Sequence, residues 1–197
     1  TNIEQCKNIF KTILEKYKSI EISVFGTGIH DPKSEKNFNL EKIRQIIEIN
    51  YFGIMNSINS IYDYYSNKKS GQISIISSIA GYRGLPAAGA YCASKSALIR
   101  FSESLYFDMI RKNVRVSIIN PGFIKTPMTD QNEFPMPMMK SAEYAAEKIY
   151  VGLIKEKGFE IHFPKTLTLI MKTIRILPNW LYFYVINFGN KFMKRDR

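Results

Sequence analysis

The stretch Ile73-Ser74-Ile75-Ile76-Ser77-Ser78, together with Tyr91-Cys92-Ala93-Ser94-Lys95 after it, indicates the fold of this 197-residue chain. The β-branched apolar run 73–76 is typical of a buried strand, and polar Ser77 and Ser78 end it. We therefore expect Ser78 at the carboxyl end of a strand. A glycine-containing loop then leads to a helix in which Tyr91 and Lys95, four residues apart, share one face.

These side chains suit proton transfer at an alcohol or a carbonyl. A free tyrosine has a pKa near 10, so acid–base work at neutral pH requires lowering that pKa by up to about 3 units, roughly 4 kcal/mol. The Lys95 cation one turn away favours the phenolate, and the Ser78 hydroxyl could hold a substrate oxygen beside the phenol. The spacing alone is a weak signal, because it recurs at positions where such pairs mostly lie on solvated helix faces: Tyr64/Lys68, Tyr65/Lys69 and Tyr144/Lys148.

Tyr91 and Lys95 differ from those pairs in their surroundings. Ser78 lies thirteen residues upstream at the expected strand end, and Ala93-Ser94-Lys95-Ser96-Ala97-Leu98 continues the helix. With these features the chain resembles the short-chain dehydrogenase/reductase family, whose members carry a Ser, a Tyr-x-x-x-Lys pair and an Asn. The resemblance implies a catalytic tetrad of Asn50, Ser78, Tyr91 and Lys95, and an NAD(P)-dependent interconversion of an alcohol and a ketone.

The resemblance also implies a role for each member of the tetrad. Tyr91 would be the acid or base, Lys95 would lower its pKa and hold the nicotinamide ribose, and Ser78 would position the substrate oxygen. Asn50 lies in Ile49-Asn50-Tyr51-Phe52-Gly53, which matches the family's Asn-x-x-Gly pattern. In relatives this asparagine holds a water in a proton path. Without the resemblance, a polar residue inside the helix expected over 40–65 could equally face water.

Two turns at expected strand ends are candidates for binding NAD or NADP. Gly26-Thr27-Gly28 follows the strand 20–25, where the family has Asn-Asn-Ala-Gly, and only the final glycine, Gly28, is retained. A Pro-Gly pair after a strand by itself marks only a turn. In the family, however, such a turn receives the nicotinamide carboxamide. The resemblance therefore adds a set of cofactor-binding residues to Gly28, Tyr91 and Lys95: Pro121, Gly122, Ile124 and Thr126.

The order of elements predicts an α/β fold of three layers, a Rossmann-like, doubly wound parallel sheet. Strands are expected at 20–25, 73–76, 114–119 and 159–163, and the polar stretch 31–38 is expected to be a loop. The resemblance covers residues 1–165, and 166–197 are predicted to be an apolar, basic helical tail.

The family's amino-terminal half-sheet has no counterpart in these residues, because no glycine-rich turn follows a strand and opens a helix. We expect the strand 20–25 to be an open apolar edge. The chain is therefore interpreted as the carboxyl-terminal part of a longer reductase, a fragment, or a truncated gene product.

Composition narrows the classes of partner. Lysine and arginine number 28 against 17 acidic residues, giving a net charge of +11, but they are scattered without the basic motif expected of a nucleic-acid binder. Cys6 and Cys92 are too few for a disulfide framework and favour a cytoplasmic setting. His30 and His162 have no neighbouring ligands at metal-binding spacing, so we expect no metal site.

Two segments raise questions of substrate and partner. Residues 127–140 contain Met128, Phe134, Met136, Met138 and Met139 and form either an irregular surface loop or an adaptable lid over a hydrophobic small-molecule substrate. The tail after Pro164 could form a homo-oligomer contact or lie peripherally on a membrane. An alternative for the whole chain is a non-catalytic interaction module that uses the open edge and the tail.

Overall fold

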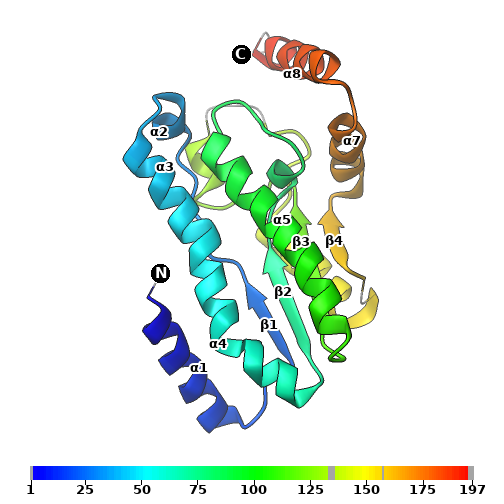
Figure 1. The fold of residues 1–197 in the computed structure, drawn as a ribbon. Coiled ribbons are helices and arrows are strands. Elements are labelled where there is room, and N and C mark those ends of the chain that lie inside the picture. Colours follow the sequence, from blue (N-terminus) through cyan, green and yellow to red (C-terminus); the bar gives the residue numbers. More distant parts are fainter. Residues whose placement is uncertain (1, 133–135, 157, 195–197) are drawn as a thin grey trace.

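The computed structural model describes residues 2–132, 136–156 and 158–194 and contains a four-stranded sheet (Figure 1). The strand order is β1-β2-β3-β4 and every pair is parallel. The strands are β1 (Ile22–Phe25), β2 (Gln72–Ile76), β3 (Arg115–Pro121) and β4 (Glu160–Phe163). The prediction of an α/β fold with a parallel sheet is confirmed.

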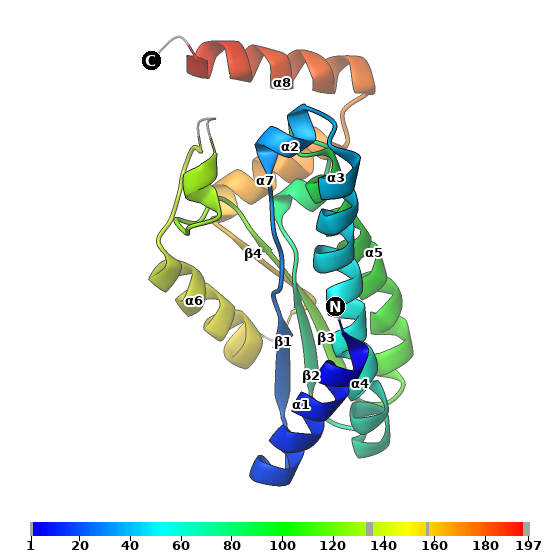
Figure 2. The same ribbon diagram turned by 90° about the vertical axis from the view of Figure 1, so that its left-hand side faces the viewer.

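Helices cover both faces of the sheet (Figure 2). One face is covered by α4 (Gly53–Lys68) and α5 (Gly89–Ile110), and the other by α6 (Ala142–Val151). The remaining helices flank these layers: α1 (Ile3–Tyr17) packs on α4, α3 (Leu40–Ile47) on α5, α7 (Lys165–Arg175) on β4, and α8 (Asn179–Lys194) ends the described chain.

The main core lies between the sheet and the α4–α5 layer. Ile73 and Ile75 of β2 are fully buried there, as the β-branched run predicts. They pack among buried side chains of the two helices and of β3, which include Ile54, Ile58, Leu98, Leu105, Val116 and Ile118. Because the strands are parallel, their carboxyl ends meet at one edge of the sheet, where open α/β sheets bind ligands.

The structure corrects two expectations about helices. The polar segment 31–38, expected to be a loop, contains the short helix α2 (Pro32–Lys36). Asp31 caps it by accepting a hydrogen bond from the Ser34 amide at 3.0 Å, and Pro32 occupies its first turn. The helix expected over 40–65 is interrupted by a π-helical turn, η1 (Glu48–Phe52), between α3 and α4.

Strand β1 pairs only with β2 among the described residues, as an edge strand does. Val24 of β1 is 44% exposed, and α1 has no buried residue although it is amphipathic. Ile9 and Tyr17 of α1 are 61% and 62% exposed. The α1–β1 side of the molecule therefore presents exposed apolar side chains next to an open strand edge.

The turn after β2 packs closely against the backbone of α5 at Gly81. In the turn η2 (Ile79–Gly81), a Cβ on Gly81 would lie 2.8 Å from the backbone carbon and oxygen of Lys95. Ser77 donates a hydrogen bond to that same oxygen at 2.8 Å. The absence of a side chain at Gly81 thus sets how closely α5 approaches the end of β2.

Gly81→Ala should lower the free energy of unfolding by roughly 1–3 kcal/mol, because a backbone contact cannot rotate away from the added methyl group. Urea unfolding followed by circular dichroism measures the change. Gly84→Ala is the matched control, since nothing lies within 4 Å of a Cβ there, and it should stay within about 0.5 kcal/mol. Equal effects of the two substitutions would refute the packing role of Gly81.

Candidate functional site

Ser78, Tyr91 and Lys95 meet where β2 ends and α5 begins. Ser78 is the N-cap of η2, and its hydroxyl accepts a hydrogen bond from the Ala80 amide at 3.1 Å and is hydrogen-bonded to the Tyr91 phenol. The Lys95 ammonium lies 5.7 Å from the centroid of the Tyr91 ring and donates to the Ile76 carbonyl at 3.1 Å. The hydroxyl, the phenol and the ammonium that the sequence singled out are therefore neighbours.

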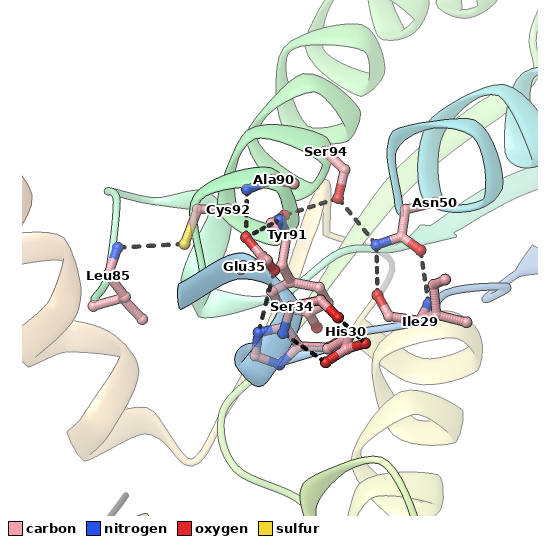
Figure 3. Close-up of polar contacts among 11 residues, drawn as sticks. Ile29, His30, Ser34, Glu35, Asn50, Leu85, Ala90, Tyr91, Cys92 and Ser94 are labelled. Atoms are coloured by element: carbon pink, nitrogen blue, oxygen red, sulfur yellow. Dashed lines mark hydrogen bonds and ion pairs between the residues drawn. The ribbon is translucent and has the colours of Figure 1, made fainter. Parts of the chain in front are cut away.

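Asn50 reaches the same place from the π-helical turn η1, and it is fully buried (Figure 3). Its side-chain oxygen accepts from the Ile29 amide at 2.7 Å, and its nitrogen donates to the Ile29 carbonyl at 2.9 Å and to the Ser94 hydroxyl at 3.1 Å. Asn50 therefore does not face water, the alternative left open by the sequence. Single π-helical turns of this kind are frequent at functional sites.

Gly28 lies next to the side chains of both Asn50 and Lys95. A Cβ on Gly28 would lie 3.3 Å from the Lys95 ammonium and 3.4 Å from the Asn50 side-chain oxygen. Both groups thus face the same point of the backbone after β1. The structure brings Asn50, Ser78, Tyr91, Lys95 and Gly28 together.

The other four cofactor candidates lie in the segment that leaves β3. Pro121 ends that strand, and the Gly122 amide donates to the Phe163 carbonyl at 2.7 Å. A Cβ on Gly122 would lie 2.9 Å from the Leu167 side chain, so close packing against α7 explains this glycine. Ile124 forms a bridge with Lys140, and the Thr126 amide donates to the Thr129 hydroxyl at 2.9 Å.

The β-bridge between Ile124 and Lys140 joins the two ends of the loop 127–140. Met128 and Met136 are half-buried, and Met138 and Met139 are exposed. Phe134 lies outside the described residues. A hollow of about 310 Å³ between this loop and the start of α6 is lined by Lys125, Thr126, Pro127, Asp130, Ser141, Ala142 and Glu143, and by no member of the tetrad. The role of this loop as a lid stays a prediction.

His30 and Glu35 belong to the site although the sequence did not single them out for it (Figure 3). The His30 ring lies over the Tyr91 ring, with centroids 4.5 Å apart. Glu35 of α2 accepts from the first amides of α5, those of Ala90 at 2.6 Å and Tyr91 at 3.4 Å, and its second oxygen lies 3.5 Å from the His30 ring nitrogen. Glu35 thus caps the helix that carries Tyr91 and Lys95.

The signal for this pair was present but ambiguous. Asp31-Pro32 is a helix-start pattern, which would have placed Glu35 in a first turn. Nothing in the sequence tells that this helix meets the amino terminus of α5. Within the described residues, no group of three or more His, Cys, Asp or Glu side chains is placed to hold a metal ion.

A family model described as short chain dehydrogenase matches residues 1–135. The chain belongs to the short-chain dehydrogenase family. An uncharacterized oxidoreductase of Myxococcus xanthus is 33% identical over 163 residues, which is 83% of this chain and 64% of that protein. The 3-oxoacyl-[acyl-carrier-protein] reductase FabG of Thermotoga maritima is 29% identical over 77% of this chain and 60% of its own length. This chain therefore spans about 60% of the length of these two relatives.

Solved structures of the family share this fold. A short chain dehydrogenase from Burkholderia cenocepacia, solved in complex with NADP, has a TM-score of 0.74 and 22% identity, covering 94% of this chain and 75% of that one. One from Burkholderia phymatum, in complex with NAD, has a TM-score of 0.73 and 18% identity, covering 87% of this chain and 70% of that one.

Burial shifts the pKa values of both Lys95 and Tyr91 in this member of the family. It lowers the pKa of Lys95, which is 4% exposed, to about 8. Burial raises the pKa of Tyr91, and the hydrogen bond from Ser78 offsets this only in part. The expectation that Tyr91 would have a lowered pKa is therefore wrong for this structure, because desolvation outweighs the neighbouring groups. Near neutral pH the phenol is protonated.

Burial also governs the charge of the His30–Glu35 pair. It raises the pKa of the Glu35 carboxyl, against the opposing hydrogen bonds from the Ala90 and Tyr91 amides. It lowers the pKa of the His30 ring. Both shifts disfavour the charged forms. The contacts of the pair with the start of α5 are the packing of His30 on the Tyr91 ring and the hydrogen bonds that Glu35 accepts from the Ala90 and Tyr91 amides.

Lys95→Met should stabilise the protein by roughly 1–3 kcal/mol at pH 7, because the wild-type fold buries an ammonium there. Between pH 8 and 10.5 the folded protein has lost this proton while the unfolded chain retains it. The unfolded state then binds more protons, so wild-type stability rises with pH in that window and the gain from Lys95→Met shrinks.

Denaturant midpoints at pH 7, 8.5 and 10 measure this difference. Lys11→Met is the matched control, because that lysine side chain is 77% exposed on α1, and it should change stability by less than about 0.5 kcal/mol at each pH. A gain from Lys95→Met that grows with pH would contradict the assignment of a buried charge.

Proposed function

We propose that the chain is the tetrad-bearing part of an NAD(P)-dependent oxidoreductase that interconverts a ketone and an alcohol. The observation that carries the proposal is the triad of Ser78 hydroxyl, Tyr91 phenol and Lys95 ammonium at the carboxyl end of β2. Membership of the short-chain dehydrogenase family and the NADP and NAD complexes of its solved relatives support it.

Residues that follow two strands, β1 and β3, fit the nicotinamide half of such a cofactor. Gly28 leaves its backbone uncovered beside the Lys95 ammonium and the Asn50 amide, so a ribose hydroxyl could approach these groups closely. Pro121, Gly122, Ile124 and Thr126 would flank the nicotinamide ring at the end of β3. When bound, the cofactor supplies the hydride.

The protein's own contribution is the proton. Ser78 would hold the carbonyl oxygen of the substrate, and the protonated Tyr91 phenol would donate its proton to that oxygen as reduction proceeds. The Lys95 ammonium would stabilise the phenolate that remains, since an opposite charge favours the ionised form. Asn50, held by Ile29 and Ser94, would keep the path for proton return open behind Lys95.

A hydrophobic ketone is the proposed substrate class. The 3-oxoacyl-[acyl-carrier-protein] reductases of Thermotoga maritima and Synechocystis, 29% and 28% identical, are named for ketones on acyl chains. The methionines of the loop 127–140 could repack around such chains. A cytoplasmic setting is proposed with it, supported by Cys6 and Cys92, which are both free thiols.

Tyr91→Phe should lower kcat for ketone reduction by about 10²- to 10⁴-fold, because it removes only the proton donor. Oxidation of NADPH with a 3-oxoacyl thioester, followed by absorbance, measures the rate. Tyr144→Phe is the matched control, since Tyr144 and Lys148 have the same spacing on α6, and its rate should be unchanged. Equal rates for Tyr91→Phe and the wild type would refute the role of Tyr91.

A titration with NADH and with NADPH, followed by nicotinamide fluorescence, separates this proposal from the alternative of a non-catalytic interaction module. Saturable binding by the folded chain supports the enzyme. No binding to protein shown to be folded by circular dichroism would favour the module, for which the exposed β1 edge at Val24 is the specific observation.

A further inference from the structure

Helix α8 exposes a stripe of aromatic side chains to solvent. Trp180, Phe183, Tyr184 and Phe188 are 72%, 59%, 65% and 58% exposed. Their spacing of three and four residues places them on one face of the helix. Isolated exposed apolar residues are ordinary, but four large aromatic side chains on one helical face mark an interaction surface. We call these four residues the aromatic stripe.

The opposite face of α8 is already used to hold the helix in place. Tyr182 is 3% exposed and its hydroxyl donates to the Gly84 carbonyl. The Arg83 guanidinium lies 3.9 Å from the centroid of the Tyr182 ring. It also donates to the Arg175 and Leu177 carbonyls, at 2.9 and 2.7 Å, where α7 ends. The helix is therefore already packed on the protein through Tyr182, and the aromatic stripe lies on its outer face.

The orientation of α8 suits a flat surface. Figure 2 shows α8 lying crosswise to the strands, at the end of the molecule toward which their carboxyl ends point. Ile176, at the end of α7 just before α8, is a further exposed apolar residue, at 78%. In the described part of the chain, no helix has the length and apolar character needed to cross a bilayer. A membrane contact here would therefore be interfacial.

The positive charge of the carboxyl-terminal segment favours an anionic partner for this surface over a second copy of the chain. The sequence from 165 to 197 contains seven lysine or arginine residues and one aspartate, a formal charge of +6 out of +11 for the chain. A second copy docked through the same face would bring two such tails together, and like charges oppose that pairing. Anionic lipid headgroups attract basic segments at about 1 kcal/mol per charge, and Trp and Tyr rings favour the headgroup region.

We infer that the aromatic stripe of α8 binds the surface of an anionic membrane, with the helix lying in the plane of the interface. Arg83 and Gly84, which anchor α8, belong to the loop between Ser78 and Tyr91. The contact would therefore set the end of the molecule that carries the tetrad toward the bilayer, from which an apolar substrate could be drawn.

Trp180 is the chain's single tryptophan and reports directly on this contact. Vesicles of phosphatidylcholine with 30% phosphatidylglycerol should shift its emission to the blue, and brominated lipids should quench it. Binding should be at least tenfold tighter than to pure phosphatidylcholine at 0.1 M NaCl, and 0.5 M NaCl should abolish the difference. These measurements require neither cofactor nor substrate, so they are independent of the proposed function.

Phe183→Ser should weaken binding to the anionic vesicles by about tenfold or more, the equivalent of one buried phenylalanine. Phe107→Ser is the matched control, because Phe107 is 65% exposed on α5, outside the stripe, and should leave binding unchanged. Equal losses for the two variants would overturn the proposal.

Two outcomes on the wild-type chain would also overturn it. One is an unshifted Trp180 emission at millimolar anionic lipid. The other is a concentration-dependent sedimentation coefficient that Phe183→Ser abolishes, with no vesicle binding, which would assign the stripe to a second copy of the chain.

Discussion

The buried ammonium of Lys95 is the constraint on which the rest of the site depends. A lysine that is 4% exposed is costly to keep charged, and the Ile76 carbonyl is its one hydrogen-bond partner among the described residues. That bond forms only if α5 lies against the end of β2. The Ser77 hydroxyl on the Lys95 carbonyl and the side-chain-free Gly81 fix this approach. Tyr91, one turn earlier on α5, is thereby placed against Ser78.

The amino terminus of α5 is the second point at which the site is fixed. Tyr91 lies in the first turn of that helix, where backbone amides have no helical partner. Glu35 accepts hydrogen bonds from two of them, and His30 packs on the Tyr91 ring. The segment that follows β1 therefore holds Tyr91 in place, while Asn50 holds that segment at Ile29. The tetrad and this segment form one connected structure.

Much of the framework could be predicted from the sequence, because the strands have strong local signals. The run 73–76 and the run 114–119 are β-branched and apolar, and both are strands of the parallel sheet close to the expected bounds. Helix interruptions were less predictable. The π-helical turn at Asn50 leaves no local pattern, since Ile46, Ile54 and Ile58 keep the helical period on both sides of it. Tertiary contacts with Ile29 and Ser94 are what stabilise it.

The expectation of a lowered pKa for Tyr91 was wrong, because it too depends on tertiary packing that the sequence does not show. Sequence spacing shows that Lys95 is near, which favours the phenolate, but it does not show how much water the fold removes. In the structure desolvation dominates at both residues, raising the pKa of Tyr91 and lowering that of Lys95.

The unusual turn Phe25-Gly26-Thr27-Gly28 can be understood by the same packing. At Gly26, a Cβ would lie 2.9 Å from the end of the Ile76 side chain. The turn thus packs closely on the last residue of β2. Gly28, which the family also has, meets a different limit, because a Cβ there would press on the Lys95 ammonium and the Asn50 amide. One glycine thus serves the fold of this chain, and the other leaves open the approach to its charged centre.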